Sequence, residues 1–239
     1  MIAGWFVAAL LLSQGELAPQ DALQFTAQPG ISWKATFKQR FYAPRSAQQE
    51  IAFEFTGSHR IVRSADGQLQ VEGGWLMSQM WMDDDKLPGV KGEPIPYRWD
   101  LASNGFPRLV MDELGDSRAF RLARIVAFAC PMKPSAYWLE VHPASDVGQV
   151  PRAQHTWKPL GTETWNGRKA LRIEFEFKEL ERQHPLLATG QLLADWSTGM
   201  LVELHAEGTN AQLPGGENEQ YDFRVEYRVD PSTAVKWPR

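Results

Sequence analysis

Apolar and polar residues alternate one by one along several segments, and this period of two restricts the fold more than any other feature of the chain. Residues 171–178, with the sequence LRIEFEFK, show the alternation most clearly. Similar runs occupy residues 31–37, 51–55, 202–206 and 221–230. A strand with this pattern turns one face toward a core and the other toward water, which is typical of antiparallel sheets.

Turn dipeptides separate these runs. Asp66-Gly67, Asn104-Gly105 and Asn166-Gly167 are pairs that readily adopt positive φ angles, which is the strongest local indication of a β-hairpin. We therefore expect a mainly β protein with about ten to twelve antiparallel strands between residues 31 and 230.

One segment departs from the period of two. Between Asp112 and Ala129 the apolar residues cluster, and Arg118, Arg121 and Arg124 recur at a spacing of three. This pattern predicts one clear helix near residues 112–129 with a basic face, and the prolines that follow would end it.

The N-terminus carries an apolar run of about eleven residues, Ile2–Leu12, whereas a bilayer crossing needs about 20. Small residues follow at Ser13 and Gly15, which favours a secretory signal peptide over residues 1–15, although no basic residue precedes the run. The alternative is a buried N-terminal segment. Export places the protein in the periplasm or outside the cell, and we expect no transmembrane segment in the mature chain.

We expect residues 16–239 to form a single β-rich domain, with strand sets at 25–142 and 154–230 joined by a linker. The length and the 43% apolar content are ample for a self-supporting core. The lone Cys130, at the end of an apolar stretch, is expected to be a buried, inert thiol. The 25 basic and 29 acidic residues, with no basic run, argue against nucleic acid as a partner.

With this number of strands, the apolar face of the sheet is too wide for one helix to bury. Ten strands spaced about 4.8 Å apart make a sheet nearly 50 Å wide, whereas one helix with its side chains is about 10–12 Å across. A single helix cannot cover the apolar face of such a sheet if it stays flat. The sheet either splits into a sandwich or curls into an open half-barrel, and in the curled form the helix packs on the concave side.

The half-barrel is the fold that we predict, with an apolar concave face that binds a lipid-like or other apolar small molecule. The side chains expected to contact this ligand are large and apolar. They are Trp33, Phe37, Phe53, Phe55, Trp75, Phe120, Phe128, Phe175 and Phe177.

Three segments carry a resemblance to a known family: Pro29–Phe37, Gly161–Glu174 and Gly190–Gly199. With them, the chain resembles the lipoprotein-carrier (LolA/LolB-like) fold, an open antiparallel half-barrel with helices in its mouth, and a family of secreted bacterial proteins of that shape. Carriers of this family hold acyl chains on the concave face, so the resemblance implies an apolar ligand. The carriers have several helices, whereas this chain has one clear helical pattern.

Motifs for catalysis are scarce, and we expect no enzyme, no cofactor and no metal. There is no Gly-x-Ser-x-Gly, His-Glu-x-x-His, Cys-x-x-Cys or phosphate-binding glycine loop. Residues 195–199, DWSTG, lack the spacing of an aspartyl protease and favour a turn capped by Asp195. The five histidines are scattered, and we expect exposed positions for them. Residues 75–82 favour an apolar strand over a Cu(I) site, and Asp83–Asp85 favour a solvated turn over a Ca²⁺ site.

Two other functions stay open. One is a structural or protein-interaction module of the cell envelope. The other is a carbohydrate-binding β-sandwich with an aromatic platform, because Trp138, Trp157, Trp165 and Trp196 lie near turns.

Overall fold

The computed structural model describes residues 28–44, 48–63, 67–83, 85–87, 93–101, 107–111, 137–142, 144, 151–213, 220–235 and 237. These residues form twelve β-strands. The strands are β1 (Ser32–Tyr42), β2 (Gln49–Arg63), β3 (Leu69–Met82), β4 (Asp85–Lys86), β5 (Ile95–Leu101), β6 (Pro107–Met111), β7 (Trp138–His142), β8 (Ala153–Trp165), β9 (Arg168–Glu179), β10 (Leu187–Asp195), β11 (Leu201–Ala211) and β12 (Tyr221–Val235).

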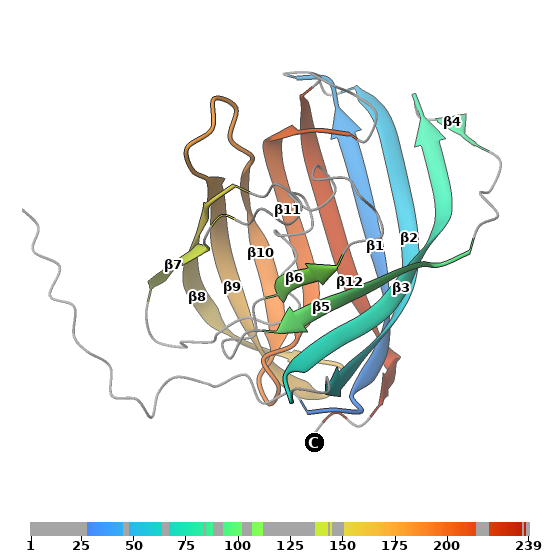
Figure 1. The fold of residues 1–239 in the computed structure, drawn as a ribbon, viewed down its shortest axis with the longest axis vertical. Helices are drawn as coiled ribbons and strands as arrows, with labels where there is room; N and C mark the ends of the chain where they lie inside the picture. Colours follow the sequence, from blue (N-terminus) through green and yellow to red (C-terminus); the bar gives the residue numbers. More distant parts are fainter. Residues whose placement is uncertain are drawn as a thin grey trace, which may run out of the picture.

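All twelve strands belong to one antiparallel sheet (Figure 1). Its order is β6-β5-β3-β2-β1-β12-β11-β10-β9-β8-β7, and the short β4 pairs with β3. The first and last long strands lie side by side, so the β1–β12 pairing joins the N-terminal and C-terminal strand sets in the middle of the sheet. The prediction of an open, mainly β sheet with about ten to twelve strands is confirmed, and the sandwich is not formed by these strands.

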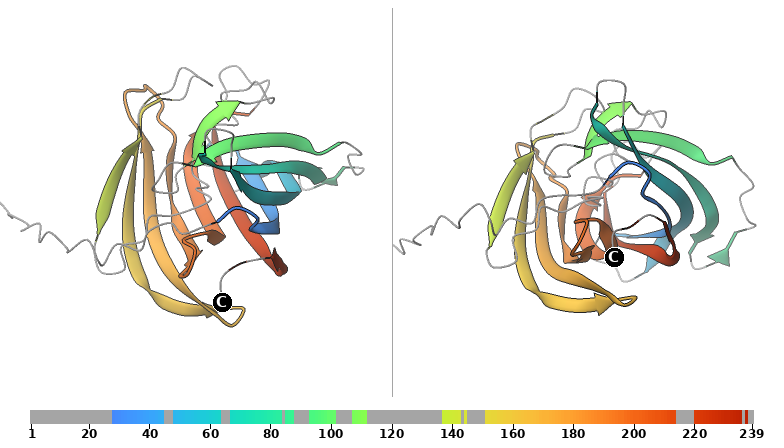
Figure 2. Two further views of the ribbon diagram at one scale, coloured as in Figure 1. Left: turned by 60° about the horizontal axis from the view of Figure 1, so that its bottom comes forward. Right: turned by 90° about the horizontal axis from the view of Figure 1, so that it is seen from below.

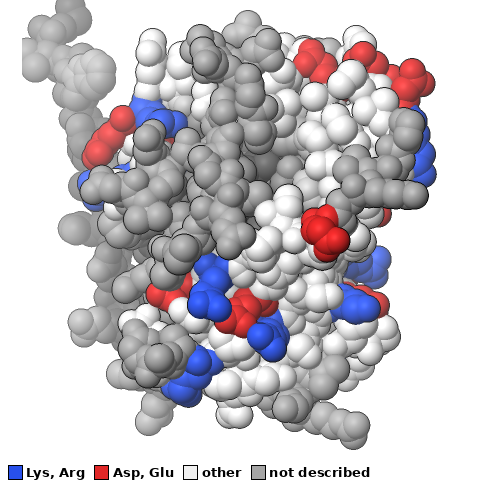
Figure 3. Space-filling model, turned by 45° about the vertical axis from the view of Figure 1, so that its right-hand side comes forward, with Lys and Arg blue, Asp and Glu red and all other residues white. Residues whose placement is uncertain are grey.

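The alternation in the sequence is the reason for the two faces of the sheet. In β9, Leu171, Ile173, Phe175 and Phe177 are buried, whereas the charged residues between them are exposed or half-buried. The inner face therefore carries the core, and the outer face carries charge. Cross-strand ion pairs such as Arg40 with Glu226, 2.7 Å apart, lie on that outer face. Figure 3 shows basic and acidic side chains next to one another on the lower part of one side of the molecule.

The sheet is strongly curled (Figure 2). Its apolar face lies on the concave side, as contacts between side chains of distant strands show. Trp75 on β3 and Tyr227 on β12 are three strands apart, which in a flat sheet is about 14 Å. Their ring centroids are only 6.4 Å apart. Side chains of strands that are not neighbours meet in this way only when the sheet bends toward them.

Tight turns form the lower end of the sheet, which is also the end where the C-terminus lies (Figure 1). The β8–β9 turn is Asn166-Gly167, with φ angles of 46° and 78°. Both residues adopt positive φ, as the type I′ turn of a two-residue hairpin requires. The turn predicted at this dipeptide is confirmed, and a second turn at Ser197–Gly199 joins β10 to β11 at the same end.

The helix predicted near residues 112–129 finds no support here. That segment lies outside the described residues, and the described residues contain no helix. Residues 83–96 have the composition of a long loop, with three aspartates, three prolines and two glycines. They nevertheless contain β4, and β5 begins within them at Ile95.

No helix in the described part of the chain is long and apolar enough to cross a membrane.

Candidate functional site

At the lower end of the concave face, six ring-bearing side chains contact one another in sequence. We call this row of rings the ring chain. Successive centroid distances along it are 5.9, 6.4, 5.4, 5.6 and 6.1 Å. Its members are Trp165, Trp237, Trp33, His59, Tyr97 and Trp99. Trp237 contacts Trp165 at the end of β8 and Trp33 at the start of β1, strands that lie five places apart in the sheet order. Trp237 thus links the two halves of the curled sheet.

Hydrogen bonds fix the polar atoms within this chain. The indole Nε1 of Trp33 donates to the Tyr227 hydroxyl at 2.9 Å, and the Tyr97 hydroxyl is hydrogen-bonded to His59 Nδ1. Burial lowers the pKa of His59 to about 3, so the imidazole is neutral at physiological pH. Burial, followed by the influence of Tyr227, raises the pKa of Tyr97 well above its usual value.

Two glycines make room for these rings. A Cβ on Gly57 would lie 2.5 Å from Trp75 Cε3 and 2.6 Å from His59 Cε1. A Cβ on Gly73 would lie 2.6 Å from His59 Nδ1 and 2.9 Å from the Tyr97 hydroxyl. The rings therefore lie against the bare backbone of β2 and β3, which brings His59 within reach of Tyr97.

The upper end of β2 and β3 differs, because its apolar side chains on the concave face stay partly exposed. We call this surface the upper strip. It consists of Ile51, Phe53 and Phe55 on β2, with Met77 and Met80 on β3. Phe55 is paired with Met77 and Phe53 with Met80, so these side chains share the concave face. Phe37 and Trp75, 5.9 Å apart, connect the upper strip to the ring chain.

The large aromatic side chains on the concave face of β8 and β9 are buried. His155 stacks on Trp157 with centroids 4.7 Å apart, and Trp157 packs against Phe175 at 5.7 Å. The exposed fractions of Trp157, Phe175 and Phe177 are 0%, 1% and 2%. This region is a packed core at the side chains that the structure describes.

The nine predicted ligand contacts therefore separate into three groups. Trp33, Phe37, Phe53, Phe55 and Trp75 gather on the concave face of β1–β3, where Trp33 and Phe37 are buried and the other three are partly exposed. Phe175 and Phe177 also lie on the concave face, but in the buried β8–β11 region. The remaining two, Phe120 and Phe128, lie outside the described residues.

The expectation that the histidines are exposed is wrong for two of them. The exposed fractions of His59 and His155 are 3% and 1%, whereas His184 and His205 are exposed. A signal was present in the sequence, since His59 follows Phe53 and Phe55 at even spacing and His155 stands two residues before Trp157. Within the described ranges, no group of three or more His, Cys, Asp or Glu side chains is placed to hold a metal ion.

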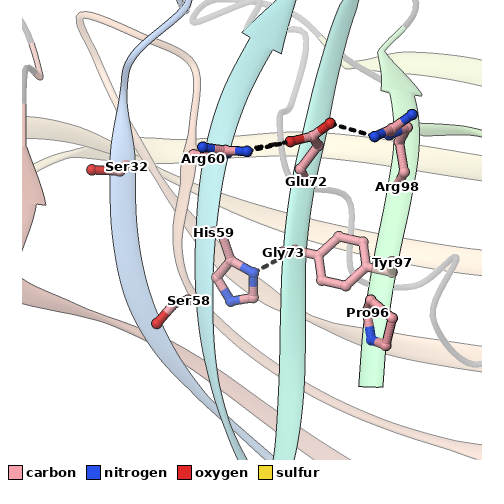
Figure 4. Close-up of a pocket in the computed structure, with 9 residues that line it drawn as sticks. All are labelled: Ser32, Ser58, His59, Arg60, Glu72, Gly73, Pro96, Tyr97 and Arg98. Carbon is pink, nitrogen blue, oxygen red and sulfur yellow. Dashed lines mark hydrogen bonds and ion pairs between the residues drawn. The ribbon is translucent and has the colours of Figure 1, made fainter. Parts of the chain in front are cut away.

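Three of the surface cavities are lined by residues that the structure describes. One, of about 670 Å³, is lined by residues of β1, β2, β3 and β5, and Figure 4 shows Glu72 between Arg60 and Arg98 at its rim. Glu72 accepts from Arg60 Nη2 at 2.9 Å and lies 2.7 Å from Arg98 Nη2. A second cavity, of about 730 Å³, lies across β9–β12. Of these three cavities, it is the one lined by a predicted ligand contact, Phe177. The third, of about 860 Å³, lies among the turns of the lower end.

The DWSTG turn at the lower end has the structure that its sequence predicts. Asp195 Oδ1 accepts hydrogen bonds from the backbone amides of Ser197 and Thr198 at 3.1 and 3.0 Å, and Arg168 Nε donates to Oδ2 at 2.6 Å. Burial would raise the pKa of Asp195, but the hydrogen bonds and charge of Arg168, together with those of the turn, lower it overall. The carboxylate is thus a charged cap of its own turn.

Comparison with known proteins gives distant similarities. No protein-family model matches the chain, and no curated protein sequence does. A structure of lipovitellin, described for its lipid–protein interactions, aligns with 89% of this chain and 26% of its own, at 10% identity and a TM-score of 0.49. The chain thus spans about a quarter of that protein's length.

Two further structures align with most of the chain. One, from Bacteroides fragilis, is named as an exported protein with a YmcC-like fold and aligns over 87% of this chain and 99% of its own, at 12% identity and a TM-score of 0.32. DynF from the dynemicin biosynthesis pathway of Micromonospora chersina aligns over 90% and 88%, at 12% identity and a TM-score of 0.22. The function of this chain therefore has to be inferred from its own side chains.

Proposed function

We propose that this is an exported, non-catalytic protein of the cell envelope that binds a lipid-like or other apolar ligand on its concave face. The observation that carries the proposal is the upper strip. Five apolar side chains lie together on the inside of a curled sheet and remain partly exposed there. Covering such a surface with an apolar molecule is favourable, by about 25 cal/mol for each Å² of apolar area removed from water.

The composition of the upper strip suits a chain-like ligand. Methionine is unbranched and polarisable, so Met77 and Met80 can adjust to acyl chains of different shape. The phenylalanines give rigid walls, with centroids of Phe53 and Phe55 6.1 Å apart. This arrangement agrees with the carrier-like half-barrel to which the sequence bears a resemblance.

The test is binding of a fluorescent fatty-acid probe to the purified full chain. Replacing Phe55→Ser is expected to weaken probe binding about tenfold, because one aromatic contact contributes about 1.5 kcal/mol. Phe53→Ser is expected to have a similar effect, and Phe55→Leu a smaller one. Thermal unfolding of each variant shows whether the sheet is intact.

Leu139→Ser on β7 is the matched control, since the exposed fraction of this apolar side chain is 50% and it lies on an edge strand. We expect unchanged probe binding in this variant, and we expect native mass spectrometry of the wild type to show a co-purifying amphiphile. A clean apo mass together with no uptake of the probe would overturn the proposal.

A second candidate function is a protein-interaction module, and β7 is the observation that favours it. Leu139 and Val141 on β7 and Tyr137 immediately before it alternate with other residues, and their exposed fractions are 50%, 43% and 66%. Exposed apolar rows on edge strands are typical of sites that pair with another chain. If Leu139→Ser abolishes a self- or partner interaction while the phenylalanine variants bind and behave as wild type, this second function is favoured.

A further inference from the structure

The cavity of about 860 Å³ at the lower end of the sheet is separate from the upper strip, and we call it the end cleft. It lies where the β8–β9 turn, the β10–β11 turn and the end of β12 meet. Tryptophans from three segments line it: Trp165 on β8, Trp196 in the β10–β11 turn, and Trp237 after β12. Trp165 and Trp196 are two of the four tryptophans that the sequence places near turns, and Trp196 belongs to the DWSTG motif.

The acidic group in the end cleft is already neutralised. Asp195 is 1% exposed and makes an ion pair with Arg168, with 2.6 Å between Oδ2 and Nε. Arg168 Nη2 also donates to Ser197 Oγ at 2.9 Å. The guanidinium is further held over the Trp237 ring, 5.6 Å from its centroid. Arg168 is thus fixed in place by the turn that Asp195 caps.

Lys169 is the second cation, and no carboxylate within the described part of the chain neutralises it. Its ammonium lies 3.6 Å from the centroid of the Trp196 ring, and the backbone amide of Trp196 donates to the Lys169 carbonyl at 3.0 Å. A cation–π contact of this kind orients the ammonium without cancelling its charge. With Arg168, Lys169 and Asp195 charged, the end cleft carries one net positive charge.

Aromatic side walls accompany this charge. The Trp165 and Trp237 rings are buried and pack 5.9 Å apart, and Trp196 is half-exposed. An oriented cation beside indole rings suits a ligand that has an acidic group on a ring or other apolar body.

We propose that the end cleft binds an anionic ligand, a carboxylate or phosphate attached to an apolar or ring-bearing body, with Lys169 as the residue that recognises the anion. Arg168 positions the turn and adds to the positive potential. This site is independent of the apolar surface in the proposed function, and it would remain if that surface bound nothing.

The experiment is a titration of the full chain with 2-naphthoate and with its neutral analogue 2-naphthamide, followed by tryptophan fluorescence and by the indole NMR signals. We expect naphthoate to shift the signals of Trp196 and Trp237 and to bind more tightly than naphthamide. Lys169→Gln should weaken naphthoate binding about tenfold and leave naphthamide binding unchanged, because it removes a charge-assisted contact. Lys169→Arg, which keeps the positive charge, should bind naphthoate as the wild type does.

Lys158→Gln is the control, since this exposed lysine on β8 pairs with Glu174 at 3.5 Å, outside the end cleft. It should bind naphthoate as the wild type does, and so should Phe55→Ser. Equal affinity for naphthoate and naphthamide, or an equal loss in the Lys158 variant, would overturn the proposal. So would binding of neutral oligosaccharides that depends on Trp196 but not on Lys169.

A second arm identifies the source of the anion. Vesicles of phosphatidylglycerol are compared with vesicles of phosphatidylcholine in the same variants. Binding to the anionic vesicles that depends on Lys169 indicates a lipid headgroup. Binding of naphthoate that depends on Lys169, without such vesicle binding, indicates a free small molecule. Absence of Lys169-dependent binding in both arms contradicts the site.

Discussion

The upper strip and the β8–β11 region lie on the same concave face, yet one is partly exposed and the other is buried. Both are built from alternating strands with large apolar side chains pointing inward. Phe53 and Phe55 are half-buried, whereas Phe175 and Phe177 are 1% and 2% exposed. The difference teaches that period-two alternation decides which side of a sheet is apolar but not whether that side is filled.

Packing explains the two outcomes. In β8–β11 the His155 ring stacks on Trp157, and Trp157 packs against Phe175, so these rings fill the space above their own strands. In the N-terminal half, Gly57 and Gly73 have no side chain, so the rings at the lower end can pack directly against the backbone. The upper strip has phenylalanines and methionines without such a close arrangement, so part of its surface stays accessible.

The largest expected effect comes from truncating one ring in each region. Phe175→Ala should lower the free energy of unfolding by about 4 kcal/mol, because it leaves a cavity in a filled core. Phe55→Ala should lower it by about 1–2 kcal/mol, because the ring is already partly in water. Urea unfolding followed by circular dichroism measures both. Equal losses would mean that the two regions are packed alike, and the comparison would fail.

Alanine at two glycines is expected to have the next largest effect. A Cβ on Gly190 would meet the backbone of His205 and Ala206, whereas one on Gly57 meets the side chains of Trp75 and His59. Backbone cannot move aside as side chains can, so we expect Gly190→Ala to cost about 3 kcal/mol and Gly57→Ala about 1–2 kcal/mol.

Gly167→Ala is the control for this pair, since open space surrounds the position and only its φ of 78° opposes a side chain. It should cost about 1 kcal/mol. A shift in tryptophan fluorescence in Gly57→Ala alone would locate the displaced Trp75 ring. A Gly57 variant less stable than the Gly190 variant would mean that the N-terminal half tolerates an added methyl group less well than the packed β8–β11 region, contrary to this expectation.

A third effect, smaller than those of Phe175→Ala and Gly190→Ala, is a pH dependence that reports whether water reaches His59 in the N-terminal half. The pKa of His59 is about 3 in the folded protein and about 6.5 when unfolded, so between these values the unfolded chain binds a proton that the folded one does not. Stability is therefore full above pH 6.5 and falls as the pH drops, by about 2 kcal/mol between pH 7 and pH 5. Unfolding curves at several pH values measure this loss.

His59→Gln should remove this slope, and His205→Gln, at an exposed position on β11, should keep it. A wild-type protein whose stability does not change between pH 7 and pH 5 would show that water reaches His59. The ring chain would then be open to water, as the upper strip is, and the contrast between them would not hold.

Much of the fold could be predicted from local pattern. The strands at residues 31–37, 171–178 and 221–230 and the Asn166-Gly167 turn follow from alternation and from residues that tolerate positive φ. The candidate site was predicted in part, because the parity of Trp33, Phe37, Phe53 and Phe55 places them on one face. His59 and the two glycines were missed, although the same parity places them among these residues.

The end cleft could not be predicted from spacing. Its lining comes from two turns about thirty residues apart in the sequence, one with Arg168 and Lys169 and the other with Asp195 and Trp196. Trp237 comes from a third segment, after β12. Their meeting depends on the order of the strands and on the degree of curl. Neither property has a local signal, since any pairing of amphipathic strands satisfies the same alternation.

The sequence by itself determined the strands, the polarity of their two faces and several of the turns, because these depend on residues two or three positions apart. Only the tertiary structure decided the strand order with β1 beside β12, the curl that brings Trp75 to Tyr227, and the contrast between the packed region and the upper strip. These features depend on how side chains from distant segments fill shared space, and that filling is a property of the whole sheet.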